Sequence, residues 1–154
     1  MTLEELNKIR QTKRELVAVR KVVKEQGEKL AAKTGYRKQV LVCGGTGCTS
    51  SGSKKVLEAL HQALKEEKLE NEILVVRTGC FGLCALGPIM IVYPEGVFYS
   101  QATPEGVKRI VKEHLKEGHV VKDLLYQETV HDDGSIISLN QTNFYKKQLR
   151  VALR

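Results

Sequence analysis

The stretch LVCGGTGCTSSGS (residues 41–53) joins a short apolar run to a glycine-rich loop that carries two cysteines. A second stretch, TGCFGLCALGP (residues 78–88), carries two more, again among glycines. The chain has 4 cysteines in all, with the spacing C-x4-C-x31-C-x3-C. All of them therefore lie in two glycine-rich loops. Whatever brings these loops together decides both the fold and the chemistry of this chain.

The segments next to the two loops predict a β-α-β unit. Short apolar runs at residues 39–43 and 72–77 are typical of buried strands. Residues 53–70 lie between them and predict an amphipathic helix, with Ser53 as its N-cap. The apolar face of that helix comprises Val56, Leu57, Leu60, Ala63 and Leu64. In such a unit the strands are parallel and their carboxyl ends lie at one edge of the sheet. Because a cysteine loop follows each strand, we expect the four sulfurs to converge there.

The rest of the central region completes a small α/β domain. Residues 89–101 predict a β-hairpin that turns at residues 94–96. Residues 103–118 predict a helix with Thr103 as its cap, Pro104 at its first position and Gly118 at its end. Its apolar face comprises Val107, Ile110, Val111 and Leu115. The order β-α-β, hairpin, helix predicts a mixed four-stranded sheet with helices. This is the layout of a thioredoxin-like domain.

Two basic segments flank this domain. Residues 1–35 predict a helix over 3–25 and a linker, and residues 128–154 form a tail. The helix pattern begins with Leu3, Leu6 and Ile9 and resumes with Leu16, Val19, Val22 and Val23. Such a helix either packs on its own domain or docks on a partner, and both readings stay open. We therefore expect three parts: residues 1–35, the domain at 36–127 and the tail at 128–154.

The charge distribution argues against nucleic-acid binding. The net charge is +7, but residues 1–40 carry 11 basic and 5 acidic side chains and residues 141–154 carry 4 and 0. Residues 41–140 carry 10 basic and 13 acidic side chains, so the predicted domain is mildly acidic. Only 5% of residues are aromatic and there is no Trp. A nucleic-acid-binding domain is expected to carry basic and aromatic side chains on its folded face.

The sequence also indicates the compartment. The apolar runs are too short to cross a bilayer, and the charged N-terminus lacks the pattern of a secretory signal. We therefore expect a cytoplasmic protein whose thiols stay reduced.

Four cysteines in two converging loops allow three kinds of chemistry. Disulfides are disfavoured in a reducing compartment, and a redox dithiol of the thioredoxin type requires C-x-x-C, which is absent. Zinc takes four thiolates but favours tighter loops than these. An iron–sulfur cluster is larger, and glycine-rich loops can offer it backbone N–H groups. From spacing alone, a zinc site and a [2Fe–2S] or [4Fe–4S] cluster remain open.

The motifs LVCGGTGCTSSGS, VVRTGCFGLCALGP and IVYPEGVFYS together resemble the thioredoxin-like [2Fe–2S] ferredoxin domain. They are most similar to its form at the N-terminus of the flavin- and NAD(P)H-binding subunit of multisubunit NAD(P)-linked hydrogenases, related to the NADH-binding subunit of complex I. The resemblance implies that Cys43, Cys48, Cys80 and Cys84 bind one [2Fe–2S] cluster. It also implies one-electron transfer with flavin, iron–sulfur centres and partner subunits.

The tail segment NFYKKQLRVALR is similar to the segment that opens the flavin-binding module of those subunits. Their glycine-rich nucleotide-binding region and further cysteine motif are absent from this sequence. The resemblance therefore implies that FMN and a [4Fe–4S] cluster belong to a downstream part. It implies that partners are other subunits of a hydrogenase or dehydrogenase complex, or a downstream flavin domain. We expect an electron-carrying module without catalytic residues of its own.

The remaining charged and aromatic residues have simpler interpretations. Arg77 precedes Cys80 by three positions and either tunes a cluster or is merely solvated. We expect His61, His114, His119 and His131 at the surface or at the edge of the core, not as ligands. Tyr93, Phe98 and Tyr99 are expected to pack in the core. The motif HDDG (residues 131–134) is expected to be a solvated turn.

Overall fold

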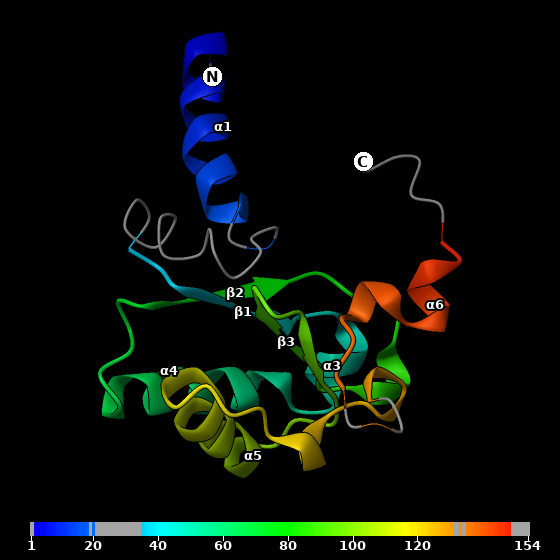
Figure 1. Cartoon of the computed structure of the whole chain (residues 1–154). Helices are drawn as coiled ribbons and strands as arrows, with labels where there is room; N and C mark the ends of the chain where they lie inside the picture. The colour runs from blue at the N-terminus through cyan, green and yellow to red at the C-terminus, as the bar shows by residue number, and fades with distance from the viewer. Residues whose placement is uncertain (1, 19, 21–34, 131–132, 134, 149–154) are drawn as a thin grey trace.

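The computed structural model describes residues 2–18, 20, 35–130, 133 and 135–148. Its N-terminal helix, α1, spans Leu3–Ala18, and Figure 1 shows it standing away from the sheet. The predicted continuation of this helix to residue 25 lies, apart from residue 20, outside the described residues. In the described part of the chain, no helix has the length and apolarity needed to span a bilayer.

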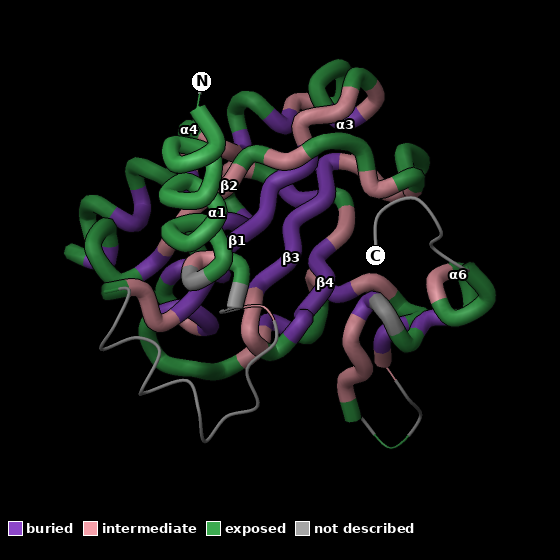
Figure 2. Tube along the Cα trace, turned by 90° about the horizontal axis from the view of Figure 1, so that it is seen from above, coloured by how far each residue is buried: buried purple, intermediate pink, exposed green. Residues whose placement is uncertain are grey.

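The centre of the fold is a mixed four-stranded sheet in the order β2-β1-β3-β4. Strand β1 (Lys38–Cys43) runs parallel to β2 (Ile73–Thr78) and antiparallel to β3 (Met90–Tyr93). Strand β4 (Val97–Tyr99) pairs with β3 as a hairpin. Every residue of β1 is buried (Figure 2), as expected for a central strand covered on both faces. The predicted thioredoxin-like α/β layout is confirmed.

One face of the sheet is covered by the two core helices (Figure 1). Helix α4 (Ser53–Glu66) joins β1 to β2, and α5 (Pro104–Arg109) follows the hairpin. The core on this face includes Val40 and Val42 of β1 together with Val56, Leu60, Leu64, Val107, Ile110 and Leu115. The predicted apolar faces therefore do point at the sheet.

The opposite face holds a second, smaller core that includes cysteines. Its buried members are Leu41, Cys43, Cys48, Ile89, Ile91, Phe98 and Leu139. Leu139 comes from the C-terminal segment, where a 3-10 turn (Leu139–Gln141) leads into helix α6 (Asn143–Lys146). The tail thus helps to cover the face of the sheet on which the first two cysteines lie.

The helix boundaries differ from prediction at three places. The N-cap of α4 is Gly52, in the left-handed region at φ 95°, and Ser53 is the first helical residue. The predicted extension of this helix to residue 70 is wrong, because it ends at Glu66. The last helix begins as expected, with the Thr103 side chain accepting a bond from the Gly106 N–H, but it changes to a π-helix over Ile110–Lys116.

Candidate iron–sulfur site

The first cysteine pair is fixed by regular structure. Cys43 is the last residue of β1 and is 1% exposed. Cys48 is also 1% exposed and lies on a short helix, α3 (Thr46–Ser50). The sequence predicted a plain loop here, and that expectation is wrong. Five residues with a central glycine are too few to show a helical period.

The second cysteine pair lies at the surface. Cys80 follows β2, and Cys84 opens a 3-10 turn (Cys84–Leu86). Both are exposed, and their sulfurs are 3.4 Å apart. A disulfide would require about 2.05 Å. All four cysteines are free thiols, so the structure gives no support to the disulfide alternative.

The two loops meet as the parallel strands predict. Cys43 and Thr78 are partners in the β1–β2 register, and the Gly44 N–H donates to the Thr78 carbonyl at 2.9 Å. The Cys43 thiol lies 3.6 Å from the Gly79 carbonyl in the other loop. Electrostatic and hydrogen-bond interactions also connect Cys43 with Cys48 and Cys80. The structure therefore brings all four predicted residues to one edge of the sheet.

Glycines allow this close approach. A Cβ atom added to Gly45 would lie 2.9 Å from the Cβ of Cys80, and one added to Gly87 would lie 2.8 Å from the sulfur of Cys48. A Cβ on Gly47 would meet Cys84 at 3.2 Å. Each of these glycines belongs to one cysteine loop and faces a cysteine of the other. Any side chain at these positions would push the two pairs of sulfurs apart.

The thiols differ in acidity because their surroundings differ. Burial raises the pKa of Cys48 to about 11, and hydrogen bonding with Cys43 adds to the effect. The Gly82 N–H donates to the sulfur of Cys80 at 3.3 Å and lowers the pKa of that thiol. Contact with Cys80 raises the pKa of Cys84. Of the two exposed thiols, Cys80 therefore ionises more readily to the thiolate, the form that binds metals.

The donor set fits a [2Fe–2S] cluster. The four sulfurs lie at one edge of the sheet as two neighbouring pairs, one buried and one exposed. A [2Fe–2S] cluster takes two cysteines at each iron, so it needs two pairs, whereas a zinc site needs its ligands around one point. The glycine N–H groups suit an anionic cluster as well.

The histidines do not join this site. His61 is exposed on α4, His119 is exposed beyond the last helix, and His131 lies outside the described residues, as does most of the HDDG motif. The expectation that His114 lies at the surface or at the edge of the core is wrong, because this residue is buried in the core. Its Nδ1 is 2.8 Å from the Tyr99 hydroxyl, and burial lowers its pKa to about 4. Phe98 and Tyr99 are fully buried, as predicted, and Tyr93 is half-buried.

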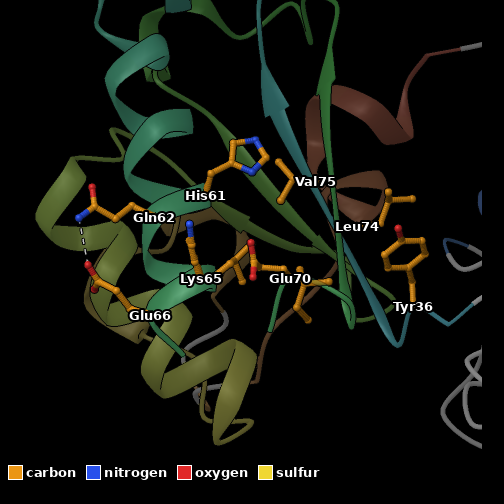
Figure 3. A pocket seen from close by; sticks show the side chains of 10 residues that line it. Tyr36, His61, Gln62, Lys65, Glu66, Glu70, Leu74 and Val75 are labelled. Carbon is orange, nitrogen blue, oxygen red and sulfur yellow. Dashed lines mark hydrogen bonds between the residues drawn. The ribbon is translucent and has the colours of Figure 1, made fainter. Parts of the chain in front are cut away.

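A hollow of about 780 Å³ between α4 and β2 is separate from the cysteines (Figure 3). Its lining mixes Lys65, Glu66 and Glu70 with apolar side chains, and it contains no thiol. The Gln62 side chain donates a hydrogen bond to the Glu66 carboxylate at 3.0 Å, which Figure 3 marks with a dashed line. Nothing about this hollow suits a redox centre.

The C-terminal segment adds contacts that sequence reasoning missed. The Tyr145 hydroxyl donates to the Phe81 carbonyl at 2.5 Å, between the two exposed cysteines. The Phe144 ring lies about 3.9 Å from a Cβ position on Gly82. These partners are more than sixty residues apart in the sequence, and no periodic pattern in the sequence predicts such a contact. The tail thereby fixes the exposed cysteine loop.

A family model described as thioredoxin-like [2Fe-2S] ferredoxin matches residues 11–115. A 2Fe-2S ferredoxin of Clostridium pasteurianum is 44% identical over 77 residues, which are 50% of this chain and 76% of that protein. The crystal structure of the wild-type thioredoxin-like [2Fe-2S] ferredoxin from Aquifex aeolicus is similar at a TM-score of 0.54 and 35% identity. That similarity covers 58% of this chain and 96% of the other.

The NADP-reducing hydrogenase subunit HndA of Solidesulfovibrio fructosivorans is more distant. It is 33% identical over 79 residues, which are 49% of this chain and 45% of that subunit. The stretch shared with this hydrogenase subunit is thus about as long as the stretch shared with the Clostridium pasteurianum ferredoxin. The segment after residue 115, which holds the tail contacts, lies outside the family match.

Proposed function

The chain belongs to the thioredoxin-like [2Fe–2S] ferredoxin family, and on that premise we propose that Cys43, Cys48, Cys80 and Cys84 hold its cluster. The family supplies the cofactor, a [2Fe–2S] cluster that takes up and releases one electron at a time. The observation that carries the residue assignment is the meeting of two buried and two exposed sulfurs at one sheet edge. The glycines Gly45, Gly47 and Gly87 make that meeting possible.

The residues around the cysteines keep the site rigid. Cys43 is anchored by the sheet, Cys48 by helix α3 and the core, and the Cys80 loop by Tyr145. A site whose ligands do not move needs little rearrangement when its charge changes. Backbone N–H groups such as that of Gly82 stabilise negative charge on sulfur.

Electrons are exchanged on the side of the exposed pair. Cys80 and Cys84 reach the surface, whereas Cys43 and Cys48 are 1% exposed. A partner can therefore approach the site most closely over the loop at residues 80–84. The aromatic ring of Phe144, 43% exposed, borders the same surface.

The broader role that we propose is that of an electron-carrying module in a multisubunit NAD(P)-linked hydrogenase or NADH dehydrogenase-type complex. The similarity to a hydrogenase subunit supports it, and so does the resemblance of the tail to the opening of a flavin module. The parts would be residues 1–35, the domain at 36–127 and the tail at 128–154. FMN and any [4Fe–4S] cluster would belong to other parts of the complex. We place this role in the cytoplasm, where free thiols persist.

Helix α1 is the docking element in this proposal. Leu3, Leu6, Ile9 and Val17 are exposed on it, although they are apolar. Glu4 and Glu5 lie between Leu3 and Leu6, and basic side chains follow from Lys8 onward. Of the two interpretations of this helix, exposure of its apolar face favours docking on a neighbouring subunit over packing on its own domain.

The test is a reductive titration of the anaerobically purified full chain with dithionite, followed by absorbance and electron paramagnetic resonance. We expect uptake of one electron per chain, reversed by oxidation. We also expect that NADPH alone leaves the cluster oxidised, since the sequence has no nucleotide-binding motif. A chain that takes up no electron would contradict the electron-transfer role, and rapid reduction by NADPH alone would contradict the assignment as a dependent module.

A further inference from the structure

Arg77 lies directly over the first cysteine loop. It pairs with Val42 in the register of β2 with β1, one position before the Thr78–Cys43 pair. Its Nη2 donates to the Gly44 carbonyl at 3.4 Å. A Cβ atom on Gly44 would be only 2.4 Å from the Nε of Arg77. The guanidinium can lie across the loop because the residue beneath it is glycine.

The positive charge of Arg77 has no carboxylate partner among the residues that the structure describes. Other arginines differ: Arg37 pairs with Glu72 at 2.6 Å and Arg109 with Asp123 at 2.7 Å. Arg77 instead donates a hydrogen bond to the Gly44 carbonyl in the first cysteine loop. This unpaired guanidinium therefore lies at the loop that follows Cys43, without a carboxylate among the described residues to neutralise it.

The immediate surroundings of Arg77 include Cys43. The two residues line one hollow of about 170 Å³ together with Ser53, Lys54 and Glu58. Two cations and one carboxylate thus line this hollow beside Cys43, the last residue of β1. The residues beside Cys43 carry a net positive charge. A cluster ligated by four thiolates is an anion that becomes more negative on reduction.

We propose that Arg77 raises the reduction potential of the centre by stabilising its reduced form through charge. The inference rests on the proposed cluster-binding function and extends it to a residue that binds no iron. Because Arg77 is exposed, solvent weakens the interaction, and we expect a modest effect. Loss of the charge should lower the equilibrium constant for one-electron reduction about threefold. At 59 mV per tenfold change, this corresponds to about 30 mV.

A purely structural role makes a different prediction. If Arg77 served only to hold the Gly44 carbonyl, a neutral donor could partly replace it and the charge would be irrelevant. Arg77→Gln keeps an N–H donor and removes the charge, whereas Arg77→Lys keeps the charge. An electrostatic role therefore predicts a lower reduction potential for Arg77→Gln but not for Arg77→Lys, whereas a purely structural role does not predict that the charge decides the potential.

The experiment is a redox titration of the full chain with its cluster bound, for the wild type and each variant. We expect Arg77→Gln to lower the midpoint potential and Arg77→Lys to retain most of it. Lys65→Gln removes the same charge from the far end of α4 and should leave the potential unchanged. The difference between wild type and Arg77→Gln should shrink as salt rises to about 1 M, because exposed charges are screened.

Glu58→Gln tests the same inference by removing a negative charge in place of a positive one. It keeps the inference testable even if Arg77→Gln does not assemble a cluster. Removal of this carboxylate from the shared hollow should raise the potential. The proposal is overturned if Arg77→Gln with an intact cluster keeps the wild-type potential, if Arg77→Lys falls as far as Arg77→Gln, or if Glu58→Gln causes no rise. A wild-type chain without a reducible cluster would instead refute the proposed function, and with it this inference.

Discussion

The two cysteine segments each supply two sulfurs, but different parts of the molecule hold them. Cys43 and Cys48 are 1% exposed and belong to a strand end, a short helix and an apolar core. Cys80 and Cys84 are exposed, in a segment held by backbone bonds and by Tyr145 from the tail. The buried pair is therefore placed by the fold and the exposed pair by local contacts. A redox centre can then be rigid on one side and open to partners on the other.

The largest effect on cluster content is expected from removing one ligand. The loss should be similar whether the replaced cysteine comes from the buried or the exposed pair. Replacement of any single cysteine by Ala should lower bound iron and sulfide about fivefold or more, since the cluster needs four thiolates. The measurement is iron and acid-labile sulfide per chain, with Ser50→Ala, at an exposed neighbouring position, as the control. Should Cys84→Ala retain a full cluster with an unaltered spectrum, Cys84 is not a ligand.

The next largest loss of cluster is expected from a side chain placed where the two cysteine loops come into contact. Gly45 has the ordinary extended φ of −63°, so alanine fits its backbone, but the new Cβ would lie 2.9 Å from the Cβ of Cys80. Overpacking of this kind costs about 1–3 kcal/mol. We expect Gly45→Ala to lose about half or more of its cluster. Gly79→Ala is the matched control, because no atom lies within 4 Å of its Cβ position. Equal cluster content in the two variants would contradict the contact.

Thiol reactivity in the cluster-free chain should sharpen the contrast between the pairs. At pH about 7.5 we expect iodoacetamide to modify Cys80 first, about tenfold or more faster than Cys48. A lowered pKa leaves more thiolate on Cys80 at neutral pH. The pKa of Cys48, raised to about 11, means that its reactivity should keep increasing as the pH rises toward that value. Mass spectrometry of quenched samples gives the order, and early modification of Cys48 would contradict its burial.

The sequence predicted the parts of this site that depend on regular patterns. Short apolar runs at residues 39–43 and 72–77 and a helical face at residues 53–70 indicated the β-α-β unit, and parallel strands place Cys43 and Cys80 at one edge. Helix α3 was missed because it is short and contains Gly47. Gly52 caps α4 in place of Ser53 because the chain turns there through the left-handed region. The burial of His114 and the Tyr145 contact depend on tertiary packing, for which a single sequence carries no periodic signal.

The smallest effect concerns the contact between the tail and the exposed loop. Tyr145→Phe removes the hydrogen bond to the Phe81 carbonyl and keeps the ring, at a cost of about 1 kcal/mol. In hydrogen-exchange measurements, amides at residues 79–84 should exchange about fivefold faster. Amides at residues 44–50 serve as the internal control and should not change. Unchanged exchange in both loops would mean that the tail does not anchor the exposed pair.

The most direct test of the central claim is the content of iron, acid-labile sulfide and zinc in the anaerobically purified full chain. We predict about two irons and two sulfides per chain, because two pairs of cysteines suit one [2Fe–2S] cluster. About one zinc and no sulfide, persisting after expression with excess iron, would contradict this. It would make the four cysteines a structural metal site and remove electron transfer from the function of this chain.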